Sequence, residues 1–143
     1  MFSIKHLFHI AVPQQKIYEA ITGIEGLAAW WTTDTSGNAD VGGTIHFKFG
    51  AVGFVDIRVT GMVANESVHW ECMDGPPDWA GHKFSFNLDR NDNKTRVRFE
   101  HSGWKDAGDH YASCNFSWGR YMESLRQLCQ SGKGAPFGSP EYK

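Results

Sequence analysis

Two histidines stand in strand patterns where an apolar side chain is expected, and an imidazole there can do chemistry. His101 closes the alternating stretch Thr95–His101, and His6 lies in the alternating stretch at the N-terminus. A neutral imidazole facing a cavity could hydrogen-bond a ligand carbonyl or act as a general base. The alternative for His101, which we favour, is a structural histidine bonded to Tyr111 or Tyr121. For His6 we also favour a structural role.

The other reactive side chains do not form a catalytic or metal motif. Cys114 would be a nucleophile only with a base beside it and a lowered pKa, and we favour a small residue that lets a helix approach a sheet. Asp106, Asp109 and His110 belong to one loop and a helix start, so helix capping and solvation are expected rather than metal binding. Nucleotide-binding and nucleophile-elbow motifs are missing from the sequence. We therefore expect no metal or cofactor, and binding is favoured over catalysis.

A pair of adjacent tryptophans, Trp30 and Trp31, points to a large interior space. Each indole buries roughly 150–250 Å² of surface, so the pair suggests a wall over a cavity. Adjacent helical residues point about 100° apart, so one of the two is expected to pack elsewhere. Trp79 and Trp104 are expected to anchor loops at the cavity rim, with a gate as the alternative. Aromatic residues make up 14% of the chain, which on composition alone is also typical of a Phe-rich core.

Charge and composition exclude several classes of protein. The net charge is −2 with no run of basic residues, so nucleic-acid binding has no electrostatic basis. No apolar run approaches 18 residues and no signal-peptide pattern is present, so a cytoplasmic protein without a membrane span is expected. Three widely spaced cysteines without a CxxC motif are expected to be reduced and buried.

The elements that position these residues follow from the hydrophobic periodicity. An alternating strand, Phe2–Val12, ends at Pro13 and is followed by two short helical patterns, 14–22 and 24–31. The polar segment 32–43 is expected to be a loop. Five further alternating strands follow at regular spacing, which predicts an antiparallel meander with one buried face. These strands centre on residues 44–49, 55–60, 68–73, 83–88 and 95–101.

The last element is an amphipathic helix of about 20 residues. From Tyr111 to Leu128 its apolar residues recur at steps of three and four. Asp109 is a plausible N-cap, Gly132 marks the C-terminal end, and residues from about 133 to 143 are expected to form an extended flap. The order predicts one α+β domain over residues 1–143, a helix-grip fold. A curved antiparallel sheet of about six strands, the first strand included, wraps around the long C-terminal helix.

At this point the chain resembles the START/Bet v 1-type (SRPBCC) helix-grip superfamily and, more narrowly, its activator of Hsp90 ATPase homologue-like group. The resemblance covers nearly the whole chain and rests on an ordered set of short motifs. These motifs are Ala11-Val12-Pro13, Trp30-Trp31, Gly42-Gly43, Val68-His69-Trp70, Gly103-Trp104, the helix with Trp118 and Leu125, and the Gly132-to-Pro136 ending.

The resemblance implies a cavity between the concave face of the sheet and the long helix. The residues that the strand and helix patterns would place around it are mostly apolar, as small-molecule pockets require. The expected lining is Trp30, Trp31, Phe47, Phe49, Ile57, Trp70, Phe84, Phe86, Phe99, His101, Tyr111, Cys114, Trp118 and Tyr121. A core filled by these same side chains is the alternative.

Three functions are compatible with such a fold. We favour binding of a small hydrophobic ligand, aromatic or lipid-like, with His101, Tyr111 and Tyr121 orienting it. The enzymatic alternative is a polyketide cyclase or aromatase in which His101 or a tyrosine moves protons. The third is a partner module for an Hsp90-type chaperone. The eukaryotic activator resembles this chain only in its C-terminal part, and an additional domain carries much of its chaperone contact. An exposed edge strand could also support a homodimer.

Overall fold

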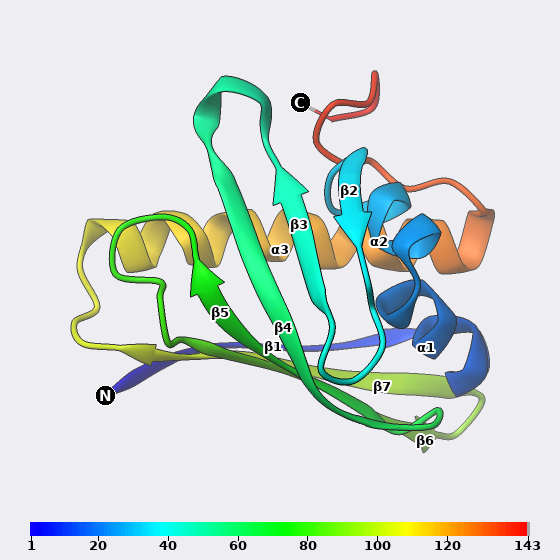
Figure 1. Cartoon of the computed structure of the whole chain (residues 1–143). Coiled ribbons are helices and arrows are strands. Elements are labelled where there is room, and N and C mark those ends of the chain that lie inside the picture. The colour runs from blue at the N-terminus through cyan, green and yellow to red at the C-terminus, as the bar shows by residue number, and fades with distance from the viewer. Residues whose placement is uncertain (143) are drawn as a thin grey trace.

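The computed structural model describes residues 1–142, and over this range it is an antiparallel sheet with helices packed on one face (Figure 1). The expected α+β helix-grip architecture is confirmed. The elements in chain order are β1 (Phe2–Ile10), α1 (Gln14–Thr22), α2 (Ile24–Trp30), β2 (Asp34–Gly37), β3 (Thr44–Lys48), the 3₁₀ turn Gly50–Val52, β4 (Phe54–Val63), β5 (Ser67–Asp74), β6 (Lys83–Asn91), β7 (Lys94–Trp104) and α3 (Asp109–Ser131).

The sheet has seven strands in the order β1-β7-β6-β5-β4-β3-β2. The first strand, β1, pairs with the last strand, β7, and forms one edge of the sheet. This pairing of the first strand with the meander was expected. The extra strand is β2, which lies inside the segment 32–43 that was expected to be a loop. That expectation was wrong because β2 is short and polar and has no alternating pattern. The turn after it brings it onto β3, where the amide of Asn38 donates to the carbonyl of Thr44 at 2.9 Å.

The two short helices after β1 are held tightly against each other. Gly26 of α2 lies on the backbone of Ala20 of α1, where an added Cβ would come within 2.7 Å of the Ala20 Cα. The indole N–H of Trp30 then donates to the carbonyl of Ala20 at 2.9 Å. Glycine is therefore needed at position 26 because the helix backbones meet there.

Helix α3 runs alongside β1 and is fastened to it at both ends (Figure 1). The hydroxyl of Tyr111 donates to the carbonyl of Ser3 at 2.7 Å, and the amide of Ala11 donates to the side chain of Gln130 at 2.8 Å. The N-cap is Gly108 rather than Asp109, because the helix begins at Asp109 itself, and no side chain caps it. The expected C-terminal end is confirmed, since Gly132 adopts φ 87° and its amide donates to the Leu128 carbonyl.

The tail that follows α3 does not extend freely but folds back over the β2 edge of the sheet. The amide of Thr33 donates to the carbonyl of Phe137 at 3.0 Å, and the amide of Phe137 donates to the carbonyl of Trp31 at 2.8 Å. These bonds tie the tail to the segment that joins α2 to β2.

Within residues 1–142, no helix combines the length and the apolar character needed to cross a membrane.

Candidate functional site

The centre of the molecule is a cluster of aromatic rings around Trp31. Its indole lies parallel to that of Trp70, with centroids 6.2 Å apart, and contacts the rings of Phe47 at 4.2 Å and Trp118 at 5.0 Å. Trp30 also stacks on Trp31, with ring centroids 6.0 Å apart. The N–H of Trp30 bonds to Ala20 of α1, and the ring of Trp31 contacts the central rings.

Six of the residues expected to line a cavity are buried and pack on their neighbours in the core. Each is at most 1% exposed, and the rings among them meet at tilted or edge-to-face angles. They are Phe47, Ile57, Trp70, Phe84, Phe86 and Phe99. Together with Trp30, these side chains occupy much of the space between the sheet and α3.

A pocket of about 160 Å³ remains beside this cluster, between the β3–β4 hairpin and α3. Five of its lining residues were expected from the sequence, namely Trp31, Phe49, Cys114, Trp118 and Tyr121. The remaining lining residues come from the hairpin, the loop after β5 and the same stretch of α3. These are Val52, Gly53, Phe54, Val55, Pro76, Trp79 and Ser117.

Among these additions, Val55 falls on the inward face predicted for the strand at 55–60, and Trp79 was expected at the cavity rim. Val52 and Pro76 belong to turns, where no periodicity marks which side chains face inward. Phe54 begins β4, and its place in the lining depends on how far the hairpin extends past α3. Tyr111, in contrast, does not line the pocket, because it bonds to Ser3 and packs edge-to-face against Phe2 and Trp104.

His101 lies behind the pocket wall, fully buried, with both ring nitrogens engaged. The indole N–H of Trp118 donates to its Nδ1 at 3.0 Å, and its Nε2 lies 2.9 Å from Nδ1 of His82. Since Nδ1 accepts, the proton of the neutral ring is assigned to Nε2, which then donates to His82. The expected partners, Tyr111 and Tyr121, were therefore wrong.

Burial, reinforced by His82 and His110, lowers the pKa of His101 to about 2. Burial also lowers the pKa of His82, against the opposing charge of Asp78. Both rings are consequently neutral near pH 7. Because His101 contacts two protein groups and lies outside the pocket lining, its geometry is that of a structural histidine.

The thiol of Cys114 at the pocket wall has a raised pKa. Burial raises the pKa of Cys114 to about 11, although the indole N–H of Trp79 opposes the shift. Burial likewise raises the pKa values of the Cys72 and Cys129 thiols to about 11, and all three cysteines are free. Burial and the neighbouring Tyr142 raise the pKa of Tyr121. Residues 1–142 contain no cluster of three side chains suited to a metal ion.

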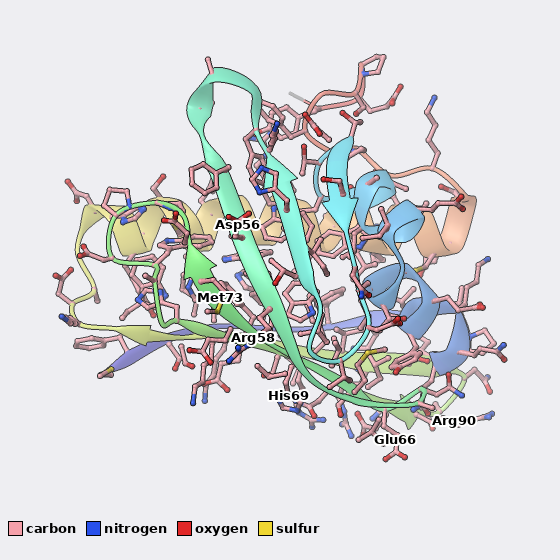
Figure 2. The ribbon with its side chains drawn as sticks, viewed as in Figure 1. Asp56, Arg58, Glu66, His69, Met73 and Arg90 are labelled. Carbon is pink, nitrogen blue, oxygen red and sulfur yellow. The ribbon has the colours of Figure 1, made fainter. Side chains whose placement is uncertain are left out.

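The outer face of the sheet has a different character. Figure 2 shows Asp56 and Arg58 on β4 with His69 and Met73 on β5, on the face turned away from α3. Asp56 bonds to the ring of His46 on the neighbouring strand β3. His6, the second histidine noted in the sequence, lies on the inner face of β1, where its ring lies 6.4 Å from that of Phe99.

Comparison with known proteins identifies the family of this chain. The model of the family described as Activator of Hsp90 ATPase homolog 1-like protein matches residues 11–130. The chain belongs to this family. The match takes in all of α1, α2 and the strands from β2 to β7, and it ends in the last turn of α3.

Solved structures agree with the family assignment. The Aha1 dimer from Colwellia psychrerythraea is 40% identical, with a TM-score of 0.86, and the match covers 94% of this chain and 100% of that chain. A protein from Mesorhizobium loti is 20% identical, with a TM-score of 0.78, over 89% of this chain and 96% of that chain. A Bacillus halodurans protein is 23% identical, with a TM-score of 0.74, over 91% and 98%. The last two show the shared fold alone. No curated protein is similar enough in sequence to count as a match.

Proposed function

We propose that this member of the family binds a small, uncharged, ring-sized apolar molecule in the pocket between the β3–β4 hairpin and α3. The observation that carries the proposal is an aromatic-walled pocket of about 160 Å³ whose described lining contains no charged side chain. Pockets for small molecules are typically apolar with a few polar groups, and here the polar groups come from Trp79, Cys114, Ser117 and Tyr121.

The size of the pocket limits the ligand to about one ring. An engineered apolar cavity of about 150 Å³ in another protein takes up benzene, so a volume of this order admits a single six-membered ring. A larger lipid-like ligand would need the interior rings, Phe47 or Trp70 among them, to move apart. Those rings are close-packed and fully buried, so that rearrangement would cost contacts throughout the core.

Filling the pocket without disturbing the core tests the proposal. Ser117 is half-buried on the pocket wall, so Ser117→Phe should occupy the space and abolish binding of a ring-sized probe such as acetophenone. Ser113 lies one turn earlier on α3, is exposed and is not part of the pocket lining, so Ser113→Phe is the matched control and should bind normally. Binding is measured by protein-observed NMR titration, and native mass spectrometry of the purified protein shows any co-purifying molecule. Equal binding by Ser117→Phe and the wild type would disprove the assignment.

A second function is favoured by the family itself, whose description names an activator of Hsp90 ATPase. We infer that the chain contacts an Hsp90-type chaperone. The measurement is the ATPase rate of a bacterial Hsp90 with and without the protein, alongside a pull-down. The Ser117→Phe variant separates the two functions, because chaperone contact through an outer surface would survive a blocked pocket. No change in the rate and no capture would exclude the contact.

We also infer that the chain forms a homodimer, because the 40% identical relative was solved as a dimer. The measurement is the molar mass in solution by light scattering across a dilution series. A mass near 16.1 kDa at all concentrations would exclude a dimer.

A further inference from the structure

The indole N–H of Trp79 is a buried donor without a partner. Trp79 is 6% exposed, and within residues 1–142 its Nε1 makes no hydrogen bond of ordinary geometry, although it lies near enough to the Cys114 thiol to lower the pKa of that thiol. The ring itself is firmly held, edge-to-face with His101 at 4.6 Å and nearly parallel to Trp118 at 6.5 Å. A buried donor that makes no hydrogen bond lowers the stability of the folded protein, so its presence calls for a structural or functional reason.

Trp79 stands at the wall of the pocket, beside Cys114. Trp79 and Cys114 are both lining residues, and the Trp79 N–H acts on the Cys114 thiol, whose pKa it lowers against the effect of burial. Sulfur is a weak acceptor, so the thiol leaves most of the donor's capacity unused. Two other tryptophans line this wall, Trp31 and Trp118, and the N–H of Trp118 is already taken by His101. Among the tryptophans of the described lining, Trp79 is the one whose N–H is fully buried without a hydrogen bond, so a ligand acceptor there would satisfy it.

Resting on the function proposed above, we propose that the ligand is a neutral ring compound bearing one hydrogen-bond acceptor, such as a ketone or aldehyde oxygen, which Trp79 Nε1 binds. The acceptor satisfies the orphaned donor while the ring contacts Trp31, Phe49 and Tyr121. A charged acceptor such as a carboxylate is disfavoured, since the described lining offers no cation to pair with it and burying an unpaired charge is costly.

The test compares two probes of the same shape that differ in one atom position. Acetophenone carries a carbonyl oxygen where α-methylstyrene carries a methylene group. In Trp79→Phe the donor is gone, so the dissociation constant of acetophenone should rise about 3- to 10-fold, whereas that of α-methylstyrene should change less than about 2-fold.

Trp104 provides the matched control. It is 4% exposed, its Nε1 is also buried without a partner in the described chain, and it is absent from the pocket lining. Trp104→Phe therefore removes an equivalent orphaned donor at a different place, and both probes should bind it as they bind the wild type.

The outcomes separate the two proposals. If Trp79→Phe weakens both probes equally, or neither, the donor does not select the ligand and this inference is overturned while the pocket stands. If neither probe binds the wild type, the proposed function itself is wrong. Should Trp79→Phe fail to fold, the indole proton of Trp79 in the wild type is the readout. It should move downfield with acetophenone and not with α-methylstyrene, and an identical response to both probes would overturn the inference.

Discussion

The indole N–H of Trp118 donates to Nδ1 of His101 at 3.0 Å, and this one bond sets the protonation pattern of a buried chain of rings. With Nδ1 occupied, the proton of His101 is assigned to Nε2, and His82 accepts it at Nδ1. These hydrogen-bonded rings link Trp118 on α3 to His101 on β7 and then to His82, which directly precedes β6. They also explain why a histidine occupies a strand position where the alternating pattern calls for an apolar residue.

Removing the donor from this chain should destabilise the protein. Trp118→Phe keeps an aromatic ring but leaves Nδ1 of His101 buried without a partner, so the free energy of unfolding should fall by about 1–3 kcal/mol from that cost alone. The measurement is equilibrium unfolding in urea. Trp104→Phe is the control, because its N–H makes no hydrogen bond within residues 1–142. A smaller loss for Trp118→Phe than for Trp104→Phe would contradict the assigned bond.

The histidine pair should make the protein less stable in mild acid. The pKa values of His82 and His101 are lowered in the folded state, that of His101 to about 2, while an unfolded histidine titrates near 6.5. Below about pH 6.5 the unfolded state therefore binds more protons than the folded state. Stability is fully present above that pH and falls as the pH drops, by up to about 1.4 kcal/mol per pH unit for each proton taken up.

This acid dependence is measured by unfolding between pH 7 and pH 5, before most carboxylates titrate. In His101→Gln, unfolding should take up about one proton fewer, so the free energy of unfolding should fall less steeply as the pH drops. His69→Gln serves as its control because His69 is exposed on the outer face of the sheet (Figure 2) and should retain the wild-type slope. A wild-type protein equally stable at pH 7 and pH 5 would refute the neutral, buried pair.

The thiol of Cys114 should react slowly, and a pocket ligand should protect it. Its pKa is raised to about 11, so near pH 8 the thiolate fraction is roughly a hundredfold below that of an unshifted cysteine. Cys72 and Cys129 have similarly raised pKa values and are buried, so Cys114 should be modified first. Alkylation by iodoacetamide, followed by peptide mass mapping, gives the rate at each site. Fast labelling of Cys114 at pH 7 would show that burial does not control this thiol.

Gly134 should tolerate no side chain. An added Cβ would lie 2.5 Å from the carbonyl oxygen of Ala29 and 2.9 Å from the hydroxyl of Ser124, where the tail passes between α2 and α3. Gly134→Ala should therefore cost about 1–3 kcal/mol of unfolding free energy through overpacking. Gly23→Ala is the matched control, since its Cβ would meet only an ordinary contact at 3.4 Å. Thermal unfolding compares the two, and equal melting temperatures would contradict the close packing of the tail.

The elements of this fold could be predicted from the sequence because their signals are local. Alternation along the middle of the chain identified the buried faces around Phe47, Trp70 and Phe99, and the three-and-four spacing from Tyr111 onward placed Trp118 on the sheet side of α3. Strand β2 was missed for the same reason. Its four polar residues have no periodicity, and only their pairing with β3 makes them a strand.

The sequence by itself determined the order of the elements, the inward faces of the strands and the aromatic character of the interior, because side-chain period follows directly from backbone geometry. Tertiary structure alone decided how much of that interior is filled, which required fitting rings such as Trp31 and Phe47 together in three dimensions. It also brought His82, from a segment without periodicity, onto His101, and Trp79 from a loop to the pocket wall. Contacts between residues far apart in the chain leave no local pattern, so the polar partners and the final pocket emerged only when the chain was folded.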